Sequence, residues 1–428
     1  MTRRLFVSAS IACGALVAAA CGGHSSDGGT APDGAVVNPQ HGDADGSLLS
    51  PGDDAGEPGS DLDGQAPGTD GTAPPSDAGA NGASSDAALH FDGGYPAGWL
   101  YTSGATIYES NGTGSGTQWM GRGVNVDDIF MCGYDDSLWM ASPATAIEQE
   151  FATLMAQWKP SFVRISLAMD SYGTVVSWLS DPSQYKTPMT GVINALGSYA
   201  GVHVLVTLRS DASMLENTAA NDPESTGLPS SSTDTPNATK FPTGTDAVYV
   251  ALVDSFANDG YVLFGLSNEP QGSAATVSAA MSHAVGVIRA EEDRLGVPHH
   301  IVSAQGIGYT SNVSQYTTAP LPYDNVVYEV HGYPPAPSAY WPPGPDGGAP
   351  NIPTILGEYG SLPTNDAGAD PAFFADLEAK KIPSLAWDFD SYNDCAPDLV
   401  NVDQSSTSIT PTTPWGTMVQ AYLLAHAP

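Results

Sequence analysis

The chain has 428 residues and a large excess of acidic side chains, with 47 Asp and Glu against 12 Lys and Arg and a formal charge of −35. This charge excludes the positive surface that binds nucleic acid or anionic lipid headgroups, so we expect no nucleic-acid partner. The 47 glycines and 35 prolines fill nearly a fifth of the positions, which points to a segment of unusual composition.

The first 20 residues have the layout of an export signal. Two arginines precede an apolar run, Leu5–Leu16, and small residues lead up to Cys21. The run is shorter than the about 20 apolar residues that span a bilayer. Ala18-Ala-Ala-Cys21 is similar to a bacterial lipoprotein processing site, where cleavage precedes a cysteine that becomes lipidated. We therefore predict a signal peptide over residues 1–20 and a lipid anchor at Cys21 in the bacterial envelope or cell surface; plain secretion is the alternative.

Residues 21–94 form a predicted linker. They carry 13 acidic residues and no Lys or Arg, and Gly, Ala, Ser, Pro and Thr dominate the remainder. Such a segment buries too little apolar surface to offset the loss of chain entropy, and its like charges repel one another. We expect a disordered, extended tether between the anchor and a folded domain.

Residues 95–428 are predicted to form one large domain of alternating strands and helices. A small β-hairpin over Trp99–Met120 comes first and is expected to plug the floor of the domain. Helical periodicity follows Ser142-Pro143, runs from Val277 to Leu295 and follows Thr413-Pro414. Eight apolar, β-branched runs predict strands: Met120–Val126, Ser161–Ala168, His203–Arg209, Tyr261–Ser267, Ile301–Gln305, Val326–His331, Thr354–Glu358 and Ser384–Asp388. The fold class is thus α/β, and eight such units fit a closed (β/α)8 TIM barrel, with an open doubly wound sheet as the alternative.

Two cysteines remain in this domain, Cys132 and Cys395. An exported chain meets an oxidising compartment, so we predict a disulfide between them; two free thiols are the alternative. The bridge would join the loop after the first strand to the loop after the eighth, which become neighbours when the barrel closes.

Acidic residues end two of the predicted strands. In a (β/α)8 barrel, chemistry takes place where strands end on the C-terminal face. The fourth strand ends in Asn268-Glu269-Pro270 and the seventh ends in Glu358, so both glutamates are expected to face one cavity. A buried carboxylate without a partner is costly, and the pair therefore indicates either structural ion pairs or a functional site.

Further polar and aromatic residues share these strands. His331 and Tyr333 lie on one face of the sixth strand by two-residue alternation, Arg164 lies within the second strand and Trp387 within the eighth. Together they offer hydrogen-bond donors, acids and a flat apolar surface, which suits a sugar.

This set of residues resembles glycoside hydrolase family 5, the group that contains endoglucanases and mannanases. The residues that carry the resemblance, in order along the chain, are Arg164, Asn268-Glu269-Pro270, His331-Gly-Tyr333, Glu358 and Trp387. The resemblance implies retaining hydrolysis of a β-linked polysaccharide, with Glu269 as general acid/base and Glu358 as nucleophile. It also implies that Arg164, Asn268, His331, Tyr333 and Trp387 bind the substrate or orient the two acids.

The expected enzyme is a monomeric hydrolase of the endo-β-glucanase (cellulase) or mannanase type, acting on β-linked polysaccharide or oligosaccharide. We expect no cofactor and no metal, because the sequence has neither His-x-His on the first strand nor HExxH. The third strand ends in Arg209, where the family commonly has a histidine, so the choice of polysaccharide stays open. A non-catalytic, carbohydrate-binding lipoprotein on the same barrel is the alternative, although retention of Glu269 and Glu358 argues against it.

Overall fold

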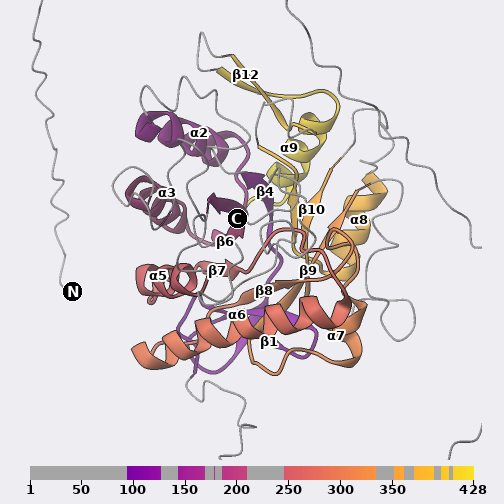
Figure 1. Cartoon of the computed structure of the whole chain (residues 1–428). Coiled ribbons are helices and arrows are strands. Elements are labelled where there is room, and N and C mark those ends of the chain that lie inside the picture. Colours follow the sequence, from indigo (N-terminus) through magenta and orange to yellow (C-terminus); the bar gives the residue numbers. More distant parts are fainter. Residues whose placement is uncertain are drawn as a thin grey trace, which may run out of the picture. The chain divides into compact units, whose positions relative to one another are not determined.

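Eight parallel strands close into a barrel in this computed structural model of the chain (Figure 1). Around the ring the order is β10-β11-β4-β5-β6-β7-β8-β9, and pairing of β11 with β4 completes the closure. The strands are β4 (Arg122–Val126), β5 (Phe162–Ala168), β6 (His203–Arg209), β7 (Val262–Gly265), β8 (Val302–Gln305), β9 (Val326–Gly332), β10 (Thr354–Tyr359) and β11 (Ser384–Ala386). The predicted (β/α)8 TIM barrel is confirmed, and the predicted strand ends agree with the observed ones to within about two residues, as expected of frayed ends.

The structure describes residues 94–126, 143–168, 178, 186–209, 245–333, 351–360, 371–389, 397–403 and 408–428. All of them fall within one compact unit, Ala80–Pro428. The predicted signal peptide and linker, Cys21, Cys132 and Cys395 lie outside the described residues. Over the described ranges, no helix combines the length and the apolar character needed to cross a membrane.

Helices cover the outer wall of the barrel (Figure 1). They are α2 (Pro143–Gln157), α3 (Thr187–Gly197), α5 (Asp246–Phe256), α6 (Ala274–Leu295), α7 (Ser314–Thr318), α8 (Pro371–Lys380) and α9 (Trp415–Ala425). The longest, α6, begins after Ser273, whose hydroxyl accepts a hydrogen bond from the backbone N–H of Thr276 at 3.2 Å. It ends at Gly296, which has a left-handed φ of 69°. The sequence predicted α2, α6 and α9 but not the others.

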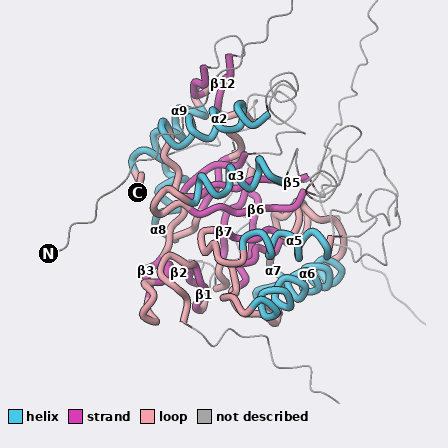
Figure 2. Tube along the Cα trace, turned by 90° about the vertical axis from the view of Figure 1, so that its left-hand side faces the viewer, coloured by secondary structure: helices cyan, strands magenta, loops and turns pink. Residues whose placement is uncertain are grey.

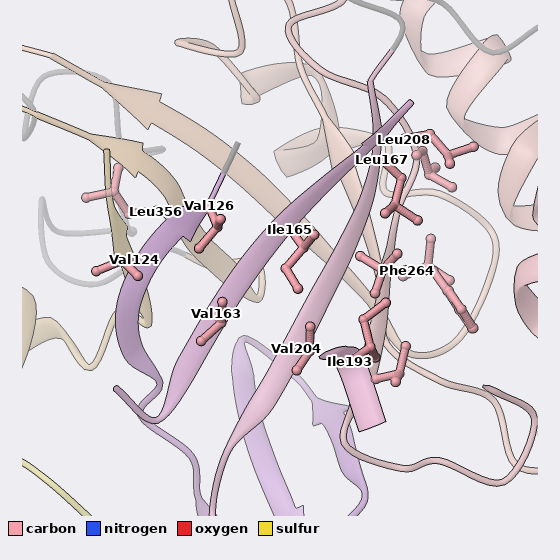
Figure 3. Close-up of a cluster of buried hydrophobic side chains, with 14 of the residues drawn as sticks. Val124, Val126, Val163, Ile165, Leu167, Ile193, Val204, Leu208, Phe264 and Leu356 are labelled. Atoms are coloured by element: carbon pink, nitrogen blue, oxygen red, sulfur yellow. The ribbon is translucent and has the colours of Figure 1, made fainter. Parts of the chain in front are cut away.

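The main hydrophobic core lies between the strands and these helices. Successive side chains of a strand point to opposite faces of the sheet, so every second residue faces outward. Figure 3 shows Val163, Ile165 and Leu167 of β5 in this position, in one cluster with Val204 of β6 and Ile193 of α3. This outer core leaves the remaining strand positions to fill the interior of the barrel.

A three-stranded antiparallel sheet seals one end of the barrel. It consists of β1 (Leu100–Ser103), β2 (Thr106–Ser110) and β3 (Gly116–Gln118), which lie at the lower edge of the barrel in Figure 2. Two of its apolar residues, and Trp119 directly after β3, join the inward side chains at the strand starts in a second core cluster: Leu100, Ile107, Trp119, Phe162, Leu205, Leu263, Ile301, Val327, Ile355 and Leu385. The predicted hairpin plug is present, and it has a third strand. A second hairpin, β12 (Val400–Asp403) and β13 (Ser408–Pro411), precedes α9.

Candidate active site

The inward side chains of the barrel change from apolar to polar along the strands. At the strand starts they form the apolar floor described above. Two residues further along, the same face of five strands carries polar side chains that are at most 1% exposed: Asn125, Arg164, Thr207, Ser303 and Glu329. Two-residue alternation thus builds a buried polar layer directly above the floor, toward the C-terminal ends of the strands.

Arg164 on β5 is the centre of this polar layer. Its Nη1 donates hydrogen bonds to Oε1 of Glu358 at 2.8 Å and to Oδ1 of Asn125 at 2.9 Å. Its Nη2 donates to Oδ1 of Asn268 at 2.7 Å, and its Nε lies 3.2 Å from Oε1 of Glu329. Burial alone would lower the pKa of the guanidinium, but Glu329 and Glu358 raise it above its usual value. Arg164 is therefore a fixed positive charge that holds the nucleophile candidate and an amide in place.

A β-bulge turns Glu358 toward the interior. On β10, Leu356 belongs to the outer core, and the next residue paired with β9 is Glu358, opposite His331. Gly357 is the extra residue between them, and Tyr359 returns to the outer core. Bulges commonly re-aim a side chain in this way. Without this bulge, alternation along the strand would direct the Glu358 carboxylate outward.

Glu269 follows β7 in an unusual backbone conformation. Its φ is +48°, a left-handed value that costs a non-glycine residue about 1 kcal/mol or more. Its backbone N–H donates a hydrogen bond to Oε1 of Gln305 at 2.6 Å, and the hydroxyl of Thr310 donates to the same oxygen at 3.0 Å. Gln305 is fully buried at the end of β8 and so anchors this peptide. The Glu269 side chain is 18% exposed against 5% for Glu358, which makes it the more accessible of the two acids.

His331 lies among three carboxylates. Its Nδ1 is 2.8 Å from Oε1 of Glu269 and 3.4 Å from Oε2 of Glu358, and its Nε2 is 3.0 Å from Oε1 of Glu329. Burial by itself would lower the pKa of His331, but these carboxylates outweigh it and raise that pKa to about 10. The imidazole therefore links the acid/base candidate to a buried carboxylate on β9.

Glu329 is that buried carboxylate. In addition to Arg164 and His331, it accepts a hydrogen bond at Oε2 from the hydroxyl of Ser303 at 2.7 Å. Burial would raise the pKa of Glu329, but the charge of Arg164 and the hydrogen bonds from His331 and Ser303 lower it to about 2. Glu329 is therefore ionised over the whole range in which enzymes work.

Tyr333 and Trp387 follow β9 and β11, the two strands that flank Glu358 on β10. The Tyr333 hydroxyl donates a hydrogen bond to Oε2 of Glu358 at 3.0 Å, and burial raises the pKa of Tyr333 well above its ordinary value, so the donor keeps its proton. Trp387 directly follows β11, its backbone N–H donates to the carbonyl of Tyr359 at 2.7 Å, and its carbonyl accepts from the indole of Trp415 at 2.9 Å. These two hydrogen bonds fix the backbone of Trp387. The contact of its ring with a sugar stays a prediction.

The two acids are close together. A carboxylate oxygen of Glu269, one of Glu358 and a ring nitrogen of His331 all lie within 4.8 Å of one another. Three such atoms could surround a cation, but here they pair with one another, and we assign no metal to them.

Direct contacts join six of the seven predicted site residues: Arg164, Asn268, Glu269, His331, Tyr333 and Glu358. Trp387 stands at the end of the neighbouring strand. Four buried partners of these residues were not predicted from the sequence: Asn125, Ser303, Gln305 and Glu329. Alternation along the strands places each of them an even number of residues from an inward-facing side chain, so the strand pattern could have indicated them.

Two predicted features fall outside what the structure describes. They are the proposed Cys132–Cys395 bridge and the side chain of Arg209. The disulfide stays a prediction.

Residues 111–341, more than half of the chain, match the family model "Cellulase (glycosyl hydrolase family 5)". The chain therefore belongs to glycosyl hydrolase family 5 and is a glycosidase, as the resemblance in the sequence predicted. The matched range contains Arg164, Glu269 and His331 and ends before Glu358, which the barrel brings into contact with Arg164 and His331.

Solved structures with the same fold include cellulases and a mannanase. A cellulase, Cel5C_n, has a TM-score of 0.57 and 16% identity, covering 78% of this chain and 95% of that one. The catalytic domain of Thermobifida fusca endoglucanase Cel5A, in complex with cellotetraose, has a TM-score of 0.53 and 16% identity, covering 76% and 97%. A β-mannanase from Streptomyces thermolilacinus has a TM-score of 0.51 and 18% identity, covering 77% and 98%. At such identities the likeness shows the fold alone, and a comparison with curated proteins finds no match.

Proposed function

We propose that the protein is a retaining β-glycosidase that cleaves β-linked polysaccharide by double displacement. The observation that carries this proposal is the separation of at most 4.8 Å between carboxylate oxygens of Glu269 and Glu358. Retaining glycosidases hold their two carboxyl groups about 5–5.5 Å apart, whereas inverting enzymes need about 6.5–9.5 Å to admit a water between acid and sugar. The short separation favours retention.

Glu358 is the proposed nucleophile. It attacks the anomeric carbon as the glycosidic bond breaks, which requires an ionised carboxylate in a fixed orientation. Arg164 supplies a charge-assisted hydrogen bond to one of its oxygens, and the Tyr333 hydroxyl supplies a hydrogen bond to the other. Both contacts favour the ionised form and set the direction of attack.

Glu269 is the proposed general acid/base. In the first step it gives a proton to the departing oxygen, and in the second it takes a proton from the water that breaks the glycosyl–Glu358 bond. Its greater exposure suits contact with a leaving group and then with water. Its partner, Nδ1 of His331, lies 2.8 Å away and can share the proton.

A neutral β-linked glucan is the proposed substrate class, with endo-β-glucanase action foremost and mannan as the second choice. Support comes from the cellulase family model and from the solved endoglucanase that was captured with cellotetraose. The formal charge of −35 would repel acidic polysaccharides and favours a neutral polymer. Asn268 and Trp387 are the proposed sugar contacts in addition to the acids.

Export is part of the proposal. The signal layout, the small residues before Cys21 and the acidic linker support an enzyme that is lipid-anchored outside the cytoplasm through Cys21. An oxidising location would also allow the Cys132–Cys395 disulfide. Mass spectrometry of the mature protein under non-reducing conditions would detect both modifications.

The test uses a panel of cellulose, mannan, xylan and β-glucan with the wild type, Glu358→Gln and Glu269→Gln. We expect hydrolysis of a β-glucan, loss of at least about 100-fold in kcat for each variant, and a first product with the β-anomeric configuration by proton NMR. Glu292→Gln is the control, since Glu292 is a fully buried carboxylate that pairs with Arg289 and His300 at the other end of the barrel. Undiminished turnover in either active-site variant would refute the assignment.

A further inference from the structure

The carboxylate of Glu329 touches the partners of both proposed catalytic acids. On one side it lies 3.2 Å from Nε of Arg164, whose Nη1 holds Glu358. On the other it lies 3.0 Å from Nε2 of His331, whose Nδ1 holds Glu269. Glu329 itself is completely buried one layer below the two acids, so it cannot contact a substrate directly.

The barrel is shaped to admit this carboxylate. A Cβ atom on Gly357 would lie 2.1 Å from Oε1 of Glu329, so only glycine at the β10 bulge leaves room for it. The Ser303 hydroxyl donates to the other oxygen at 2.7 Å. The bulge that turns Glu358 inward and the space that holds Glu329 thus depend on the same residue.

We infer that Glu329 is a positioning residue for both proposed catalytic acids. It keeps a proton on Nε2 of His331, which leaves Nδ1 to share a proton with Glu269, and it holds Arg164 against Glu358. This inference rests on the proposed function. An ionised carboxylate only accepts hydrogen bonds, so the ring nitrogen that faces Glu329 must carry hydrogen in both the neutral and the charged imidazole.

The consequence is one proton shared between Oε1 of Glu269 and Nδ1 of His331. With the proton on Glu269 the pair is ready to protonate a leaving oxygen. Once that proton has left with the sugar, Glu269 is the carboxylate that the second step needs, and Nδ1 of His331 carries no hydrogen. The proton leaves the pair with the departing sugar and returns from the attacking water, so the balance closes over one turnover. Because the two groups are coupled, the basic limb of the pH profile reports the pair.

Charged groups reach this pair from several strands. Glu269 follows β7, Glu329 lies on β9 and Glu358 on β10, and all three face the His331 imidazole. Arg164 on β5 faces it through Glu329 and Glu358. The Tyr333 hydroxyl donates to Glu358, and the charge of Asp388, which follows β11, also acts on it. Among these, Glu329 is the one anion that faces Nε2 and has no proposed contact with substrate.

The experiment compares wild type, Glu329→Gln and Glu329→Asp on two substrates over a pH range. One is a dinitrophenyl glycoside, whose leaving group departs without a proton, and the other is an unactivated oligosaccharide, whose leaving group requires one. For Glu329→Gln we expect kcat/KM on the oligosaccharide to fall about tenfold more than kcat/KM on the dinitrophenyl glycoside. General acid catalysis accelerates such a reaction by about 100- to 10,000-fold, and the variant should lose a part of this acceleration. We also expect the basic limb to move to lower pH by about one unit, because an anion facing His331 is removed. Glu329→Asp keeps the negative charge, so the basic limb of its pH profile should lie close to that of the wild type.

Two further measurements separate positioning from general stability. Glu292→Gln removes an equally buried carboxylate whose Oε2 lies 2.5 Å from Arg289 and whose Oε1 lies 2.8 Å from His300. It should lose thermal stability while keeping the wild-type pH limb and the wild-type ratio between the two substrates. NMR titration of the His331 ring in the resting protein should show its proton lost at lower pH in Glu329→Gln.

The outcomes distinguish this inference from the proposed function. An unchanged His331 titration in a folded Glu329→Gln variant, or an equal loss on both substrates with an unchanged basic limb, overturns the role of Glu329. A wild type that hydrolyses none of the β-linked substrates overturns the proposed function instead, and the NMR titration still decides whether Glu329 sets the proton on His331.

Discussion

At the scale of single residues, Arg164 determines whether the interior of the barrel can hold acids. It is fully buried, and its guanidinium contacts two carboxylates and two amides at distances of 2.7–3.2 Å. A buried charge that loses its partner is strongly destabilising, and a planar fork can satisfy several acceptors that a single ammonium cannot.

Two replacements of Arg164 should therefore separate the effect of its positive charge from the effect of its planar shape. Arg164→Met leaves Glu329 and Glu358 without their cation, and we expect the free energy of unfolding to fall by about 3–5 kcal/mol. Arg164→Lys keeps the charge and should unfold at an intermediate denaturant concentration, yet lose most of its turnover because Glu358 is no longer oriented. Denaturant unfolding and kcat measure the two effects, and Arg294→Met, at a side chain that is 60% exposed, is the control with little change in either. A fully active Arg164→Lys would contradict the orienting role.

At the scale of elements, the bulge in β10 connects the fold to the site. It places Glu358 opposite His331 and leaves at Gly357 the space that the Glu329 carboxylate fills. The strand therefore requires glycine at position 357.

Gly357→Ala tests this dependence. The added methyl group would overlap the Glu329 carboxylate, so we expect the free energy of unfolding to fall by about 1–3 kcal/mol, as overpacking typically does, and turnover to fall as well. Gly191→Ala is the matched control, because it lies in α3 with open space around its Cβ position, and it should raise stability by about 0.5–1 kcal/mol. Thermal unfolding and kcat of both variants provide the measurement, and a stable, active Gly357→Ala would show that the carboxylate can move.

The elements also show how far the sequence alone reaches. The eight strands could be predicted because each is a short apolar run with alternating faces, and α6 because its caps and apolar stripe are long and regular. The helix α5 was not recognised, since Val248 to Val253 is as typical of a buried strand as of a helix. Alternation from Ile355 directs Gly357 inward and Glu358 outward. The position of Glu358 at the end of its strand predicted that it faces the cavity, but the bulge that turns it there could not be predicted from the strand pattern. Alternation places Glu329 on the same face as His331, but the sequence does not show which cation such a buried acid pairs with.

At the scale of the whole molecule, buried titratable groups set the pH range of stability. The His331 pKa is raised from 6.5 to about 10, so its contribution is complete below pH 6.5 and is lost as pH rises toward 10. Burial of His203 lowers its pKa from 6.5 to about 4, so that contribution is lost as pH falls from 6.5 to 4. The Glu329 pKa is lowered from 4.5 to about 2, so its contribution is lost only as pH falls from 4.5 toward 2.

We therefore expect the melting temperature to be highest near pH 6.5 and to fall on both sides. Scanning calorimetry from pH 3 to 10 measures the curve. His203→Gln should flatten the melting curve between pH 6.5 and 4 and leave the alkaline side unchanged, because His203 lies at the start of β6, on the far side of the apolar floor from His331. A melting temperature that rises from pH 7 to 10 would contradict the assignment of the alkaline limb to His331.

The sheet β1–β3 closes the barrel at the starts of its strands. With Leu100, Ile107 and Trp119 packed against the strand starts, a long sugar chain has no passage through the protein. In the proposed function, the sugar therefore reaches Glu269 and Glu358 from the C-terminal ends of the strands, and both products leave on that same side. In the proposed anchored enzyme, residues 21–94 set the distance over which the site can reach a polymer.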